Sequence, residues 1–135
     1  MLRFLSLIIG LFLLISCANT VDAYSLDPLQ GEYRITGLQG KKVTDNEMIF
    51  NFDPVGNRVT GMTGCNNFTA NFTQNGQQLE FSVPMNTRKY CEGRMETEKQ
   101  ILTSLEKAAR IQQNGREITI FADEEEPLIT LTKIK

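Results

Sequence analysis

The residues that could carry chemistry in this 135-residue chain are few, and their types limit the chemistry. The sequence contains no histidine. That absence excludes Ser/His and Cys/His nucleophile pairs and argues against a zinc site of ordinary ligand mix. The carboxylates fall mostly in turns or on expected exposed helix positions, without a partner of separated pKa. We therefore predict that the protein is not an enzyme, with no catalytic residue, no metal site and no cofactor.

The charge pattern argues against nucleic acid as a partner. The chain has 14 basic and 16 acidic residues, and the basic ones are scattered rather than interleaved with aromatic residues. The one acidic run, residues 123–126, lacks the glycine-spaced ligand order of a calcium loop. We interpret that run as a solvated connection between two strands.

Three cysteines remain as reactive side chains, and the first of them follows an apolar run. Residues 4–15 are mostly apolar, and about 12 residues are too few to cross a hydrocarbon core of roughly 30 Å. Residues 1–16 instead fit a signal peptide. The sequence Leu14-Ile15-Ser16-Cys17 resembles a bacterial lipobox, which implies acylation of Cys17 and cleavage before it. The alternative is an ordinary secreted protein with a chance cysteine near its cleavage site.

A lipobox would define the organisation and location of the chain. Residues 1–16 would be the signal peptide, 17–28 the lipidated N-terminus and tether, and 29–135 the folded domain. Two or more acyl chains anchor a protein stably to a membrane. In a diderm host, alanine rather than aspartate at position 18 favours the periplasmic face of the outer membrane. We expect an exported, lipid-anchored monomer with an unknown envelope protein as its partner.

The other two cysteines, Cys65 and Cys91, lie 26 residues apart. In an oxidising compartment they could form a disulfide, which would contribute about 3 kcal/mol in the chain-entropy model. Two free buried thiols acting as small apolar groups are the alternative. We expect the disulfide.

Short segments with period-2 alternation dominate the rest of the chain and predict strands with one apolar face. Glycines at 61 and 64 predict a tight corner with positive φ or close backbone approach. From about residue 94 to 110 the period becomes helical. The segments that we expect to be strands are 31–38, 48–52, 58–62, 67–73, 78–83, 117–121 and 128–132.

These segments predict a mainly β domain. About seven or eight antiparallel strands with one helix (about 94–110) packed on them favour a curled sheet or small barrel over a doubly wound α/β fold. We expect five phenylalanines to fill its interior; they are Phe50, Phe52, Phe68, Phe72 and Phe81.

One carboxylate, Glu98, shares a helix face with Met95, Leu102 and Leu105. It could lie at the edge of the buried stripe. Alternatively it points inward and pairs with Arg88, whose guanidinium can bind a carboxylate bidentately. We predict the structural ion pair Arg88–Glu98, which would fix the helix register without a catalytic role.

Three segments in order resemble the META domain family: Gly61-Met62-Thr63-Gly64-Cys65-Asn66, the Thr-Arg segment 87–91 that ends in cysteine, and the Met-x-x-Glu helix that begins at Met95. The resemblance covers roughly residues 29–134. It departs from the family pattern at Tyr33, where tryptophan is common, and at Glu92, where proline is frequent. Bacterial members include the heat-inducible HslJ lipoproteins. The resemblance implies a small lipocalin-like antiparallel barrel with a helix, no established catalytic residues, and associations with heat and envelope stress.

Three functions are compatible with these observations. The first is a non-enzymatic envelope lipoprotein, a binding or chaperone-like module linked to heat or envelope stress. The second is an inhibitor of a host enzyme such as lysozyme, although the net charge of −2, which becomes −3 without Arg3, suits a cationic target only weakly. The third is a small-ligand carrier, which would need an unfilled interior.

Overall fold

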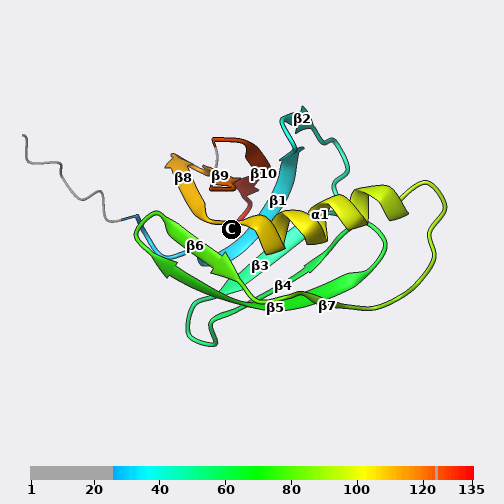
Figure 1. Ribbon diagram of the computed structural model, residues 1–135, viewed down its shortest axis with the longest axis horizontal. Helices are drawn as coiled ribbons and strands as arrows, with labels where there is room; N and C mark the ends of the chain where they lie inside the picture. Colours follow the sequence, from blue (N-terminus) through cyan, green and yellow to red (C-terminus); the bar gives the residue numbers. More distant parts are fainter. Residues whose placement is uncertain (1–25, 124) are drawn as a thin grey trace, which may run out of the picture.

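In the computed structural model, residues 26–123 and 125–135 are described, and they form ten strands and one helix (Figure 1). Every strand pairing among them is antiparallel. The elements in chain order are β1 (Gly31–Leu38), β2 (Lys41–Lys42), β3 (Ile49–Asp53), β4 (Arg58–Met62), β5 (Asn67–Asn75), β6 (Gln78–Phe81), β7 (Met85–Asn86), α1 (Met95–Lys107), β8 (Arg110–Asn114), β9 (Glu117–Phe121) and β10 (Pro127–Lys133).

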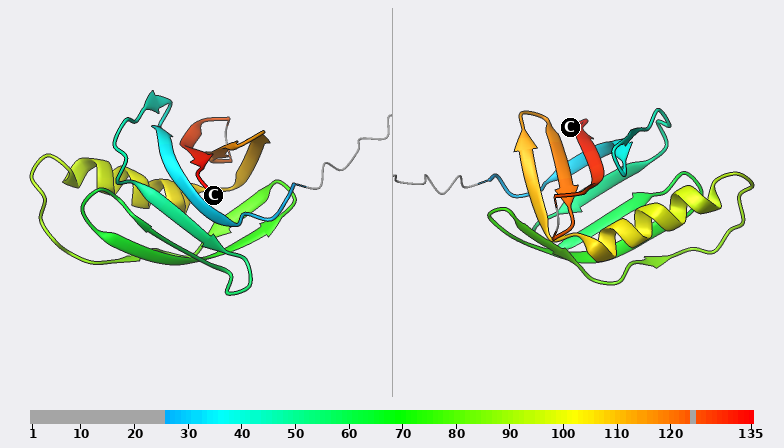
Figure 2. Two further views of the ribbon diagram at one scale, coloured as in Figure 1. Left: turned by 180° about the vertical axis from the view of Figure 1, so that it is seen from behind. Right: turned by 45° about the horizontal axis from the view of Figure 1, so that its top comes forward.

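The sheet curls until its ends meet. Its strand order is β10-β9-β8-β6-β5-β4-β3-β1-β2, and β1 also pairs with β10, while β7 lies beside β5. The two views of Figure 2 show α1 lying along one open end, between the β5–β7 side and the β8–β9–β10 side. This arrangement confirms the predicted mainly β, curled antiparallel sheet with one helix.

The closed sheet has one thin seam, between β6 and β8. Their register consists of a single residue pair, Gln78 opposite Arg110, whereas β8 and β9 share five pairs. Two backbone hydrogen bonds flank the pair, from the Leu79 amide to the Ala109 carbonyl and from the Ile111 amide to the Gln77 carbonyl. The chain reaches this seam only after passing through α1, so the helix is inserted where the strands are least connected.

Alternation decides which side chains enter the core. Phe50 and Phe52 on β3 and Phe68 and Phe72 on β5 are all buried. Their rings meet edge to face, with centroids 4.9 Å apart for Phe50 and Phe68 and 5.3 Å apart for Phe52 and Phe72. Edge-to-face pairs stabilise the fold beyond the free energy gained by burying the rings. Phe81, the fifth predicted core aromatic, is only partly buried and packs against this cluster.

The helix ends earlier than its sequence pattern suggests. The prediction extended to about residue 110, but α1 ends at Lys107 and Ala108 has an extended backbone with ψ 130°. The Ala109 amide then donates to the Phe121 carbonyl, and β8 begins at Arg110. Ala108 and Ala109 favoured a further helical turn in the sequence. Strand pairing with β9 replaces that turn.

Three strands were not predicted. Both β2 and β7 are two residues long, too short for any periodicity to appear. The third, β8, contains one buried residue, Ile111, among polar neighbours. The turn between β8 and β9 contains Asn114-Gly115, a dipeptide typical of hairpin turns, and Gly115 has a φ of +61°.

Candidate functional site

The motif residues meet at the corner between β4 and β5, beside the start of α1. Gly64 turns the corner with a φ of +89°. Gly61 has no positive φ, but a Cβ there would lie 2.5 Å from the Ile49 carbonyl oxygen and 2.5 Å from the Phe68 ring. The two glycines are therefore required for different reasons. Gly64 adopts the predicted positive φ, and Gly61 allows the predicted close approach of the backbone to its neighbours.

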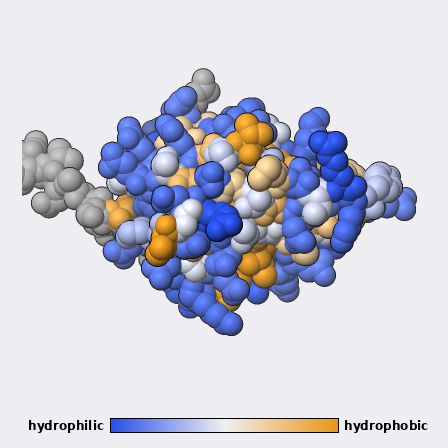
Figure 3. Space-filling model, turned by 90° about the horizontal axis from the view of Figure 1, so that it is seen from below, coloured by the Kyte–Doolittle hydropathy of each residue, from blue (hydrophilic) through white to orange (hydrophobic). Residues whose placement is uncertain are grey.

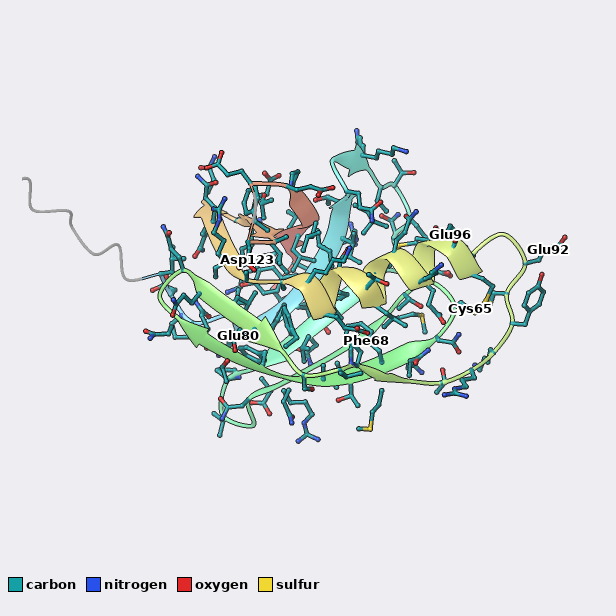
Figure 4. The ribbon with its side chains drawn as sticks, in the orientation of Figure 1. Cys65, Phe68, Glu80, Glu92, Glu96 and Asp123 are labelled. Atoms are coloured by element: carbon teal, nitrogen blue, oxygen red, sulfur yellow. A yellow bond between two sulfur atoms is a disulfide. The ribbon has the colours of Figure 1, made fainter. Side chains whose placement is uncertain are left out.

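A disulfide joins this corner to the segment before α1. Cys65 and Cys91 are bonded, with their Cα atoms 5.9 Å apart. This confirms the predicted pairing over the alternative of free thiols. Figure 4 shows Cys65 beside the beginning of the helix. The bond holds the corner and the helix approach together at the end of the molecule where the β7–α1 loop has few strand contacts.

Asn66 is fully buried and connects the three motif segments. Its Oδ1 accepts hydrogen bonds from the Lys89 amide at 2.8 Å and the Thr87 hydroxyl at 2.7 Å. Its Nδ2 donates to the Lys89 carbonyl at 3.0 Å. Because backbone groups of Lys89 contact both ends of the amide, its orientation is fixed. The remaining Nδ2 hydrogen must therefore point toward Glu98.

Glu98 points inward and is 5 % exposed. The Thr63 hydroxyl donates to its Oε2 at 2.7 Å, and Asn66 Nδ2 lies 2.9 Å from the same oxygen. Asn86 Nδ2 donates more weakly to Oε1, at 3.4 Å. Neutral donors thus surround the carboxylate in the way that a buried acceptor requires.

The predicted ion pair between Arg88 and Glu98 is not formed. Arg88 is exposed, and the ion pairs between described residues are those of Arg94 with Asp45 and Glu47. The prediction of an inward Glu98 was right, but its partner was wrong. The physical reason is that Asn66 and Thr63 already supply the hydrogen bonds, so Arg88 can keep its guanidinium in water instead of paying the cost of desolvation.

Arg94, directly before α1, is the arginine that contacts the corner. Its Nη1 donates to Asp45 Oδ2 at 2.7 Å and to the Gly64 carbonyl at 2.8 Å. A third, longer contact reaches Glu47 Oε2 at 3.3 Å. The Arg94 side chain is 40 % exposed, so these contacts orient the helix start more than they stabilise the fold.

We call the hydrogen-bonded group Thr63, Asn66, Asn86, Thr87 and Glu98 the corner cluster; Thr63, Asn66 and Glu98 are buried, Asn86 is partly buried and Thr87 is exposed. Its hydrogen bonds run among its own members and the Lys89 backbone. Sequence reasoning missed every member except Glu98. The signal was present, since Thr63 and Asn66 are polar residues inside the glycine-flanked motif. The cluster holds the corner, the 86–89 segment and α1 together, and its geometry is that of a structural clamp.

The most strongly buried titratable group elsewhere is Tyr33, on β1, which is 3 % exposed. Burial raises the pKa of its phenol above 10.0, a backbone hydrogen bond with Gln30 opposes this shift, and the charge of Asp27 adds to it. The ring packs edge to face on Phe52, with centroids 5.6 Å apart. Tyr33 therefore fills the core position at which the family pattern often has tryptophan.

A hollow on the surface lies at the other end of α1. This groove has a volume of about 670 Å³ and is lined by residues of β6, the end of α1 and the β9–β10 connection. Four of its residues are acidic and one is basic: Glu80, Glu106, Asp123, Glu126 and Lys107. Figure 4 shows Glu80 and Asp123 on this side of the helix. We call it the acidic groove.

A second surface feature is apolar. Met62 on β4 and Met85 on β7 lie opposite the outward-facing Asn67 and Thr69 of β5, so both methionines point away from the core. Met85 is 71 % exposed, and the neighbouring Val83 and Tyr90 are 74 % and 80 % exposed. We call Met62, Val83, Met85 and Tyr90 the outer patch. The face shown in Figure 3 is largely hydrophilic with separate hydrophobic areas.

The described residues include no group of three or more His, Cys, Asp or Glu side chains placed to hold a metal ion. In the same part of the chain, no helix is long and apolar enough to cross a membrane. The predicted lipid attachment at Cys17 and the signal peptide 1–16 lie outside the described residues, as does most of the predicted tether 17–28.

Together the closed antiparallel sheet, the single helix and the disulfide-linked corner define a small β domain with a structural clamp. The sequence model of the META domain matches residues 26–134. The chain therefore belongs to the META domain family. A search of curated proteins found no match.

Solved structures share this fold at low sequence identity. An NMR structure with 18 % identity covers 76 % of this chain and 88 % of its own, with a TM-score of 0.60. An NMR structure of a protein from Burkholderia xenovorans has 16 % identity, coverage of 78 % and 83 %, and a TM-score of 0.61. A crystal structure of a DUF4847 family protein from Bacteroides vulgatus has 10 % identity, coverage of 64 % and 58 %, and a TM-score of 0.53. At these identities the similarity supports the fold.

Proposed function

We propose that this protein is a non-enzymatic envelope lipoprotein, anchored through Cys17, whose domain is a binding or chaperone-like module linked to heat or envelope stress. The observation that carries the proposal is the outer patch. Val83, Met85 and Tyr90 are each more than two thirds exposed, and all belong to one segment between β6 and α1. Several exposed apolar side chains in one segment can serve as an interaction surface, whereas single ones are ordinary.

The position of the patch suits a binding surface. Met85 forms only a two-residue strand with β5, and the backbone from Thr87 to Cys91 is irregular. The corner cluster holds this segment through hydrogen bonds to the Lys89 backbone, and the disulfide holds it through Cys91. A firmly attached segment can expose apolar side chains without unfolding. Binding by such a segment loses little conformational entropy.

The absence of catalysis in this proposal rests on the corner cluster. Catalytic groups need an unoccupied position where a reacting atom can lie within hydrogen-bond reach. The Glu98 carboxylate is 5 % exposed and its oxygens face Thr63 and Asn66. The motif residues thus act on one another. In a diderm host, the proposed location is the periplasmic face of the outer membrane.

The proposal is tested by an aggregation assay with a thermally unfolding client protein. The chain from residue 18 onward keeps all described contacts, since these lie within 26–135. We expect it to reduce light scattering by the client, and we expect the Val83→Ser, Met85→Ser, Tyr90→Ser variant to lose that effect. Val55→Ser is the matched control, because Val55 is 94 % exposed but lies in the β3–β4 turn. Equal protection by both variants would contradict the proposed surface.

A second candidate function, inhibition of a cationic host enzyme such as lysozyme, is favoured by the acidic groove. The groove is lined by four carboxylates and one lysine, so it is locally negative. The small net charge of the whole chain does not reveal this local charge. Charge complementarity of this kind speeds association. Lysozyme activity measured with the wild-type chain and with Glu80→Gln/Glu106→Gln would separate the candidates. Inhibition that the double variant loses would favour this function over the outer patch.

The third interpretation, a small-ligand carrier, is disfavoured by the packing of the interior. Phe50 and Phe52 are 0 % and 2 % exposed, and neighbouring rings contact them edge to face. A ligand in that space would have to displace aromatic side chains that already bury one another. We therefore base the proposed binding on the surface.

A further inference from the structure

A groove on the outer face of β1 and β10 collects positive charge. It has a volume of about 350 Å³, and its lining contains Arg34, Arg116 and Lys133 together with the hydroxyls of Thr36 and Thr132. We call it the basic groove. No carboxylate is among its lining residues. The Lys133 ammonium lies over the Tyr33 ring, 5.7 Å from its centroid, so the charges that face the groove are those of Arg34 and Arg116. In a chain of net charge −2, two guanidinium groups at one hollow without an acidic partner need a physical explanation.

Arg34 provides the second observation. It faces outward, because its neighbours Tyr33 and Ile35 are buried on the inner face of β1. Among the described residues, its Nε is the one buried side-chain nitrogen or oxygen without a hydrogen-bond partner. Buried N–H groups are almost always paired, so this one stands out as a donor without an acceptor. The unpaired donor lies on the edge of the guanidinium that binds oxyanions through two parallel N–H groups.

The neighbouring groups are held in place. Arg116 Nη2 donates to the Lys133 carbonyl at 2.7 Å and to the Ile134 carbonyl at 3.3 Å, which fixes its side chain across the groove. The Thr36 and Thr132 hydroxyls lie 3.0 Å apart. Glu32 and Glu117 occupy nearby outward positions, and neither forms an ion pair with these cations. Neither Arg34 nor Arg116 therefore forms an ion pair with a carboxylate of the described residues, and their charges can act on a ligand.

We propose that the basic groove binds a phosphate group. A phosphate carries about two negative charges and several acceptor oxygens, which match two guanidinium groups and adjacent hydroxyls better than a monocarboxylate would. The phosphate could belong to a lipid headgroup or to a soluble compound. The lipid source rests on the proposed membrane anchor at the N-terminus. The groove lies on β1, and β1 begins only a few residues after Leu26, the first described residue. The soluble source does not depend on it.

The test follows the arginine Nε–Hε signals by NMR while inorganic phosphate is added to the chain from residue 18 onward, at constant ionic strength. We expect the signals of Arg34 and Arg116 to shift and saturate, while Arg58, which is exposed on β4, serves as the internal control. Arg34→Lys keeps the charge but lacks Nε, and should weaken phosphate binding about tenfold or more. Arg116→Gln should do so independently if Arg34→Lys perturbs the fold. An Arg34 signal that does not respond to phosphate would overturn the proposal.

Vesicles distinguish the two sources. Phosphatidylcholine vesicles containing phosphatidylglycerol are compared with vesicles given the same surface charge by oleate, which has no phosphate. Preferential binding to phosphatidylglycerol that Arg34→Lys loses and Arg58→Lys keeps would identify the headgroup. Binding of inorganic phosphate without vesicle preference would identify a soluble phosphate compound. Equal loss in Arg34→Lys and Arg58→Lys in both assays would show unspecific attraction and overturn the site.

Discussion

The two ends of α1 are held in different ways. At its start, the corner cluster, the Cys65–Cys91 disulfide and Arg94 fix the helix to the β4–β5 corner. At its end, the chain passes into the β6–β8 seam, where Gln78 and Arg110 form the single residue pair, and the acidic groove lies open beside it. The comparison teaches that the disulfide and the side-chain hydrogen bonds of the motif residues hold the start of α1, whereas the end of α1 is held by the strand that follows it and borders the open acidic groove.

The largest expected effect comes from removing the centre of the corner cluster. Asn66→Ala should lower the free energy of unfolding by about 4 kcal/mol, because it removes four hydrogen bonds of about 1 kcal/mol each: two with the Lys89 backbone, one with the Thr87 hydroxyl and one with Glu98. Urea denaturation measures the loss. Gln78→Ala at the seam is the control and should cost no more than about 0.5 kcal/mol, as an exposed substitution. Similar losses at both ends would contradict the comparison.

The next effect concerns the disulfide. Replacing Cys65 and Cys91 together by alanine should lower the free energy of unfolding by about 3 kcal/mol, because the unfolded chain gains the freedom of the closed loop. Hydrogen exchange should accelerate most between residues 86 and 95 and little at β8 and β9. A uniform acceleration over the whole sheet would mean that the bond does not act on the corner end in particular. Wild-type protein kept reduced should behave like the variant.

A smaller effect is expected at Glu98. Glu98→Gln should cost about 1–3 kcal/mol, since the new amide NH₂ faces the donors of Thr63 and Asn66. Arg88→Met should cost little, and the double variant should show the sum of the two losses, because the residues do not pair. A coupling energy well above the error in this cycle would restore the ion pair that the sequence predicted.

The smallest effect appears only at high pH. Burial raises the pKa of Tyr33, so the folded protein keeps the phenol proton more tightly than the unfolded chain does. The contribution of the Tyr33 phenol to stability is complete below pH 10. It is lost as the pH rises from 10 through the raised pKa of the folded state. Tyr33→Phe should therefore show a flatter decline in stability above pH 10. Tyr90→Phe is the matched control, because Tyr90 is 80 % exposed and should leave the decline unchanged.

Much of this fold could be predicted from local patterns. Alternating residues predicted the long strands. The dipeptide Asn75-Gly76 is typical of a hairpin turn, and it lies in the β5–β6 hairpin, where Asn75 pairs with Gln78 and Gly76 has a φ of +57°. Helical spacing located α1 to within three residues at its end. These features depend on neighbours in the chain, whose geometry the backbone period determines.

The partners of Glu98 depended on tertiary structure. The sequence by itself determined that Glu98 shares a face with buried residues, and that Thr63 and Asn66 stand in a glycine-flanked motif. Two loops and a helix far apart in the chain had to meet before Asn66 could take the position that Arg88 was expected to take. Short strands such as β7 and the single-pair seam likewise carry no periodic pattern. The choice of a neutral amide over a guanidinium was decided by burial, because an amide satisfies a buried carboxylate without a second charge to desolvate.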